Sequence, residues 1–172
     1  TSLLDWRHIA GDHDLSQRLI DAAASSLFAP SKLASLLECL GSAVRARHDR
    51  FGSSVYLLEP DVKNSLGALR DLDVAGWAAR ARWGVADSQG LVRFGVLVGR
   101  QVTAVERARE HVWRVRNLLH HAAGRRSDRL SFERQEDIAL LLGYGPDRSE
   151  AVEHMMSHYY RAARIIARYS EL

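Results

Sequence analysis

The chain has 172 residues with a formal net charge of +3, and hydrophobic residues make up 47% of it. That is enough apolar material for the core of one domain, and so small a net charge does not favour a nucleic-acid partner. No apolar run reaches membrane-spanning length, so we expect neither a membrane segment nor a signal peptide. Cys39 is the single cysteine, which excludes a disulfide within the chain and fits a reducing cytoplasm. Because the chain starts at Thr1 and not at Met, we expect a fragment of a longer protein.

Apolar residues recur at spacings of three and four along most of the chain, as in amphipathic helices. This spacing predicts six helices, over about residues 15–26, 30–44, 68–83, 101–123, 131–142 and 149–169. Ser31 is the expected N-cap of the second helix, and Gly124 ends the fourth. Two loops are expected, at 51–68 with a short extended piece at 55–58, and at 84–99 with one helical turn. Six helices with mostly short connections predict an all-α antiparallel bundle.

One polar loop stands out between the second and third predicted helices. It reads Glu59-Pro60-Asp61-Val62-Lys63-Asn64-Ser65-Leu66-Gly67-Ala68-Leu69-Arg70-Asp71. Pro60 excludes regular helix at its start, and Gly67 relaxes the backbone where the next helix begins. Lys63 and Arg70 are therefore presented together at a helix N-terminus, where anions are favoured. We expect both residues to contact a phosphate, and the alternative is an internal salt bridge to Glu59, Asp61 or Asp71.

A second polar stretch joins the end of the fourth predicted helix to the fifth. It contains Arg116, a basic loop with Arg126 and Arg129, and Asp128 between those two arginines. We expect Asp128 to act as a cap or to pair with Arg126 or Arg129, so that the stretch clamps the loop structurally. Seven further residues are expected to support the phosphate contacts of Lys63 and Arg70. They are Glu59, Asp61, Asp71, Arg116, Arg126, Asp128 and Arg129.

We assign no catalytic residue and no metal ligand to this chain. A nucleotidyltransferase needs two or three carboxylates to hold its metal ions. Glu59 with Asp61, or Asp71 with Asp73, could supply a pair, but neither pair lies on a predicted strand and no third carboxylate is evident. The sequence has no P-loop, no glycine-rich dinucleotide motif and no Cys-His pair.

Several segments resemble, in the right order, the bacterial PII-uridylyltransferase family. Residues 59–71 with Trp77 resemble its Glu-Pro-x-x-Lys…Gly-Gly-Leu-Arg-Asp…Trp motif, and the related glutamine-synthetase adenylyltransferases have a similar loop. Residues 113–120, which read Trp-Arg-Val-Arg-Asn-Leu-Leu-His, resemble its next helix, and parts of 124–144 resemble the run that follows. Met156, Tyr159-Tyr160 and Arg161 resemble its Met-x-x-Tyr-Tyr-Arg helix. The family's Pro-Gly-Gly is Leu66-Gly67-Ala68 here, and the Cβ at 68 blocks the closest backbone approach.

The resemblance implies a parent enzyme that transfers UMP from UTP to a tyrosine of the nitrogen-signalling protein PII and removes it again. Residues 1–12 would leave an upstream nucleotidyltransferase domain, and residues 13–172 would form a helical domain similar to nucleotidyltransferase substrate-binding domains. That domain would help position the nucleotide or a PII-like protein and would be inactive alone, with Mg²⁺ ligated outside it. Neither nucleic acid nor a membrane is an expected partner. The alternative is a non-catalytic helical interaction or scaffold domain of another nucleotidyltransferase-associated signalling protein.

Overall fold

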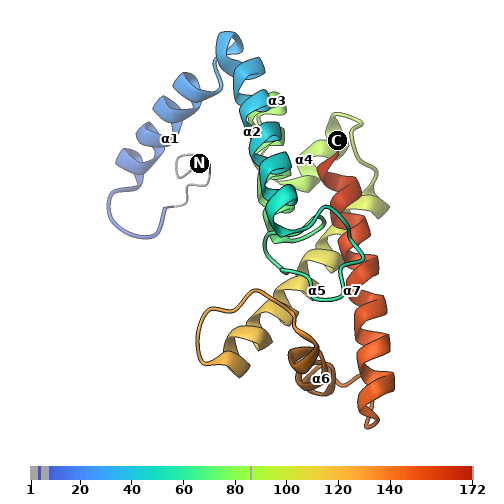
Figure 1. The fold of residues 1–172 in the computed structure, drawn as a ribbon. Coiled ribbons are helices and arrows are strands. Elements are labelled where there is room, and N and C mark those ends of the chain that lie inside the picture. Colours follow the sequence, from blue (N-terminus) through green and yellow to red (C-terminus); the bar gives the residue numbers. More distant parts are fainter. Residues whose placement is uncertain (1–3, 5–7, 86, 172) are drawn as a thin grey trace.

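The computed structural model describes residues 4, 8–85 and 87–171, and these form seven helices (Figure 1). They are α1 (His13–Leu27), α2 (Pro30–Phe51), α3 (Leu69–Trp83), α4 (Ser88–Arg93), α5 (Gly99–Ala123), α6 (Phe132–Leu141) and α7 (Arg148–Ser170). The predicted all-α fold is confirmed, and α4 corresponds to the helical turn expected in the second loop. Half of the predicted exit segment, residues 1–3 and 5–7 of 1–12, lies outside the described residues.

Two local predictions are wrong. The helix α2 begins at Pro30 after Ala29, and no side chain caps it, so Ser31 lies inside the first turn. Proline suits that first position because its missing N–H would have no intrahelical partner there. The segment 55–58 is not extended but forms turns and bends, with the Tyr56 amide donating to the Ser54 hydroxyl at 3.1 Å.

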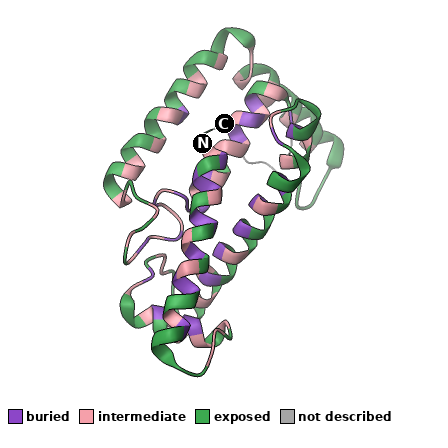
Figure 2. Cartoon of the chain, turned by 90° about the vertical axis from the view of Figure 1, so that its right-hand side faces the viewer, coloured by how far each residue is buried: buried purple, intermediate pink, exposed green. Residues whose placement is uncertain are grey.

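The main core lies where α7 packs against α3, α5 and α6. Apolar side chains recurring along α5 and α7 meet there, and they are fully buried at Val112, Val115, Leu119, Met155 and Ile166. Figure 2 shows buried segments at intervals along the long helices, alternating with intermediate and exposed ones. The pattern explains the spacing of three and four, since one face of each helix enters the core.

Helix α1 differs from the others in that none of its residues is buried. It packs chiefly against α2, and it stands away from the bundle in Figure 1. Leu15 and Leu19, which share one face of this helix, are 58% and 48% exposed. The predicted bundle therefore holds for α2 to α7 but does not include α1 as a core member.

No single helix among the described residues is both long and apolar enough to cross a membrane. The pair α1 and α2 meets the length and composition criteria only when taken together, and the two helices are bent by 85° at their junction.

Candidate functional site

Residues 59–71, which we call the 59–71 loop, end at a buried acid that joins three parts of the chain. The side chain of Asp71, in the first turn of α3, is fully buried. It accepts a hydrogen bond from the Gly67 amide at 2.7 Å, and it also contacts Arg47 and, at 2.9 Å, His48 Nε2. Burial lowers the pKa of Arg47, while the charge of Asp71 opposes that shift. Asp71 therefore fixes the end of the loop to α2.

The backbone of the loop lies directly against α7 at Gly67. This residue has φ +77°, and a Cβ there would lie 2.3 Å from the carbonyl oxygen of Ala163. Only glycine tolerates both the conformation and the contact. The closest backbone approach at this loop is thus made to α7, and Ala68 beside it is fully buried.

Asp61 closes the loop on itself. Its Oδ1 accepts hydrogen bonds from the amides of Lys63 at 3.0 Å and Asn64 at 2.7 Å, which is an Asx turn. The Ser65 hydroxyl accepts from the Asp61 amide at 3.0 Å and donates to the carbonyl of Phe51 at 2.9 Å. Asp61 therefore sets the conformation of the backbone that carries Lys63.

The second polar stretch, after α5, holds the 59–71 loop in place through backbone and side-chain hydrogen bonds. The Val62 amide donates to the Asp128 carbonyl at 2.8 Å, and the Leu130 amide donates to the Pro60 carbonyl at 2.9 Å. Glu59 accepts from Arg129 at 2.7 Å and from the Phe132 amide at 3.0 Å. These hydrogen bonds, that from Arg129 first, lower the pKa of Glu59. The predicted structural clamp is present.

The partners predicted for Asp128 are wrong. Its carboxylate accepts a hydrogen bond from Arg116 Nε at 2.7 Å and lies 3.1 Å from His120 Nε2. Both of these residues belong to α5, the helix that precedes Asp128. Burial works to raise the pKa of Asp128, but the hydrogen bonds from Arg116 and His120 outweigh it and lower that pKa. Arg129 pairs with Glu59 instead, and Arg126 is exposed.

Lys63 and Arg70 are brought together at the backbone, because the Arg70 amide donates to the Lys63 carbonyl at 2.9 Å. The side chain of Arg70 is 35% exposed, and its guanidinium lies 3.2 Å from Asp73 and 5.9 Å from the ring centroid of Trp77. The positive charge of Lys63 contributes to lowering the pKa of Asp128. Neither cation pairs with Asp71, whose partners come from α2. Both side chains thus remain outside the buried network.

The acids of the loop do not converge on one point. Glu59, Asp61 and Asp71 each accept hydrogen bonds from different protein donors. Among the residues that the structure describes, no group of three or more histidine, cysteine or acidic side chains is placed to hold a metal ion. The acids of the 59–71 loop thus serve to hold the loop itself together.

Sequence reasoning missed Arg47 and His48, and it named Gln135 only as part of the second polar stretch, without a role. The Gln135 side-chain amide donates to the carbonyls of Leu58 at 2.7 Å and Leu130 at 3.0 Å, which ties α6 to both stretches. A buried glutamine in an apolar helix face is a detectable signal, since such a group needs partners. No comparable signal marks Arg47 and His48, because their partner lies 24 and 23 residues away.

The model of the family described as "GlnD PII-uridylyltransferase" matches residues 37–172. This chain belongs to that family. Relatives over its whole length are bifunctional uridylyltransferase/uridylyl-removing enzymes, 38% identical in Pseudomonas fluorescens SBW25, 38% in Ectopseudomonas mendocina ymp and 35% in Pseudomonas putida GB-1. The chain spans about a fifth (19%) of the length of each of these curated relatives. No solved structure matches it.

The PII-uridylyltransferase resemblance expected from the sequence is therefore confirmed. The family match begins inside α2 and includes the 59–71 loop, its clamp and α7. Helix α1 precedes the matched residues, although the relatives align with it.

Proposed function

We propose that this chain is the helical accessory domain of a longer, cytoplasmic PII uridylyltransferase, and that it positions nucleotide or protein substrate beside an upstream nucleotidyltransferase domain. The longer enzyme would transfer UMP from UTP to a PII-like protein, and any Mg²⁺ would be held outside this chain. Support comes from the family membership and from the small share of the relatives' length that the chain covers.

One observation supports a role of the 59–71 loop in binding: its acids and its cations are used differently. Its acids are used internally, by Asp61 in the Asx turn and by Asp71 toward α2. Lys63 and Arg70 are joined by a backbone hydrogen bond, and their side chains stay outside that network. A rigid loop that presents two cations is suited to an anionic group, such as the phosphates of a nucleotide.

The test is Arg70→Ala in the longer enzyme. A charge-assisted hydrogen bond contributes about 1.5–3 kcal/mol, so nucleotide affinity or turnover should fall roughly tenfold or more. Stability should change by no more than about 1 kcal/mol, because the pair with Asp73 is surface-exposed.

A matched control is Arg134→Ala. Arg134 lies in the first turn of α6, is 30% exposed and pairs with Asp137 at 3.6 Å in the same i, i+3 arrangement. Its loss should leave nucleotide affinity and turnover unchanged. If Arg70→Ala behaves like Arg134→Ala, Arg70 has no role toward the nucleotide, and the scaffold alternative gains support.

A further inference from the structure

An open groove of about 650 Å³, which we call the α7 groove, lies between the C-terminal half of α7 and the segment that joins α2 to α3. Val55 and Leu66 line it from that segment, and Ile165 lines it from α7. All three residues are partly exposed, so they offer apolar surface that a bound partner can cover. Neither Lys63 nor Arg70 lines the groove, which makes it distinct from the two cations of the 59–71 loop.

The two sides of the α7 groove are held together by contacts at both ends. The Tyr160 hydroxyl on α7 donates to the Leu57 carbonyl at 3.1 Å, which fixes the segment beside the groove. Next to Leu66, the backbone of Gly67 lies directly against Ala163 of α7. A partner therefore meets a preformed surface, and little of the binding free energy is lost to rearrangement of the groove.

Three arginines of α7 line the same groove, Arg161, Arg164 and Arg168. Their spacing of three and four puts them on one face of the helix, within about 10 Å of each other along its axis. All three are exposed, and within the described part of the chain no carboxylate forms an ion pair with them. Among the described lining residues Glu171 is the only acid. The groove therefore carries an excess of positive charge.

The helix itself does not explain this row of arginines. A cation in the last turn, such as Arg168, suits the negative end of the helix dipole, but Arg161 and Arg164 lie before that turn. From residue 154 to residue 170 the sequence has no acid, so α7 offers these arginines no partner one turn away. The row is thus available to carboxylates from outside the helix.

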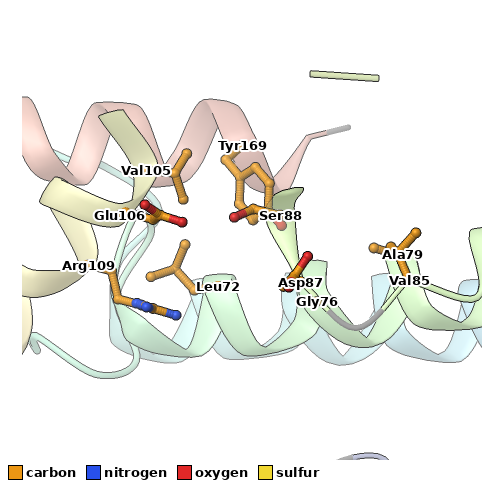
Figure 3. Close-up of a pocket in the computed structure, with 10 residues that line it drawn as sticks. All are labelled: Leu72, Gly76, Ala79, Val85, Asp87, Ser88, Val105, Glu106, Arg109 and Tyr169. Atoms are coloured by element: carbon orange, nitrogen blue, oxygen red, sulfur yellow. The ribbon is translucent and has the colours of Figure 1, made fainter. Parts of the chain in front are cut away.

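The enclosed cavity between α3, α5 and α7 has a different balance of charge. Figure 3 shows Glu106, Arg109 and Asp87 around that cavity, which is two acids with one base. The α7 groove has three bases with one acid among its described lining residues. Its charge therefore favours an anionic partner, and its apolar surface favours one that also carries apolar side chains.

We propose that the α7 groove docks a separate protein through a segment that carries two or more acidic residues next to an apolar residue. The carboxylates pair with the three arginines, and the apolar side chain lies over Leu66 and Ile165. Alternate side chains of an extended segment are about 7 Å apart, so acids at alternate positions match the length of the arginine row. A polyphosphate would leave the apolar surface uncovered, and a net charge of +3 does not favour a nucleic acid.

Selection of random heptapeptides displayed on phage, with the 172-residue chain as the target, tests the proposal. We expect the selected peptides to be enriched in glutamate and aspartate beside leucine, isoleucine or phenylalanine. The tightest of them, labelled with a dye, should bind about tenfold or more weakly to the variant with Arg161→Gln, Arg164→Gln and Arg168→Gln, as measured by fluorescence anisotropy. Its binding to the unaltered chain should weaken as the salt concentration rises, because exposed ion pairs are screened.

The matched control is the variant with Arg100→Gln, Arg107→Gln and Arg114→Gln. It removes the same charge from exposed arginines of α5, and these do not line the α7 groove. Both triple variants should keep the unfolding midpoint of the unaltered chain within a few degrees, since all six side chains are exposed. Only the α7 variant should lose affinity for the selected peptide.

Three results would overturn the proposal. The first is a set of selected peptides that is not enriched in acidic residues. The second is equal affinity of the selected peptide for the two triple variants. The third is displacement of the labelled peptide by inorganic tripolyphosphate, or by a single-stranded DNA oligonucleotide, at a lower concentration than the unlabelled peptide requires. That last result would assign the groove to a phosphate-bearing ligand instead of an acidic protein segment.

Discussion

The 59–71 loop and helix α1 differ in burial, and the difference is the opposite of what their secondary structure suggests. Up to the first turn of α3 the loop has no regular structure, yet it contains fully buried residues, Val62 and Ala68 among them. Helix α1 is regular over His13–Leu27 and well capped by Asp12, yet none of its residues is buried. The conformation of the loop is held by side-chain hydrogen bonds and close packing. The conformation of α1 is held by its own helical hydrogen bonds and by its contacts with α2.

The contrast shows which part of the domain can hold a functional group in a fixed position. The loop is linked to α2 through Asp71 and to the start of α6 through the bond from the Phe132 amide to Glu59. It is also joined to the segment after α5, because the Val62 amide donates to the Asp128 carbonyl. A cation carried by such a loop loses little conformational freedom when a ligand binds. On α1, by contrast, Leu15 and Leu19 are 58% and 48% exposed, and only its last residue, Leu27, packs against the cluster that contains Leu40 and Trp77.

The largest expected effect comes from Asp71→Ala. The change leaves the partly buried guanidinium of Arg47 without its acid and removes the bond to the Gly67 amide. Breaking a buried pair by removing one partner costs about 3–5 kcal/mol, which urea unfolding would measure. Asp73→Ala, two residues on and 45% exposed, is the control and should cost about 1 kcal/mol or less. If both variants lose the same free energy of unfolding, Asp71 does not hold the loop and α2 together as described.

Gly67→Ala should have the next largest effect. Left-handed conformation costs a Cβ-bearing residue about 1–2 kcal/mol, and overlap with the Ala163 carbonyl adds about 1–3 kcal/mol. Gly143→Ala is a matched control, because Gly143 has φ +79° and an ideal Cβ there meets no described atom within 4 Å. Thermal unfolding should therefore show the larger loss at Gly67. Similar losses at both glycines would mean that the loop is not pressed against α7.

Leu15→Ser and Leu19→Ser in α1 should have the smallest effect. Exposed positions away from special features change stability by about 0.5 kcal/mol or less. The same substitution at fully buried Leu119 should cost several times more, about 2–5 kcal/mol. If serine at 15 or 19 destabilises the chain as much as serine at 119, α1 belongs to the core after all.

The sequence predicted the fold class and the helix positions, because the period of apolar residues depends only on which face of each helix is buried. It also placed Lys63 and Arg70 together, since both flank the start of α3. It could not predict that Asp71 pairs with Arg47 and His48, or that Asp128 pairs with Arg116 and His120. Those partners depend on how α2, α3 and α5 cross, and the sequence offers several equally suitable arginines. The exposure of Leu15 and Leu19 on α1 could not be predicted either, since the spacing of apolar residues does not reveal what covers them.

Amide hydrogen exchange across the whole chain tests the central claim most directly. The account predicts that the amides of Val62, Leu69 and Arg70, which donate to carbonyls at 2.8–3.3 Å, exchange as slowly as those in the buried turns of α5 and α7. The amides of α1 should exchange much faster, despite their regular helical hydrogen bonds. Loop amides that exchange as fast as those of α1 would contradict the claim that the 59–71 loop is a rigid centre able to hold Lys63 and Arg70 in place.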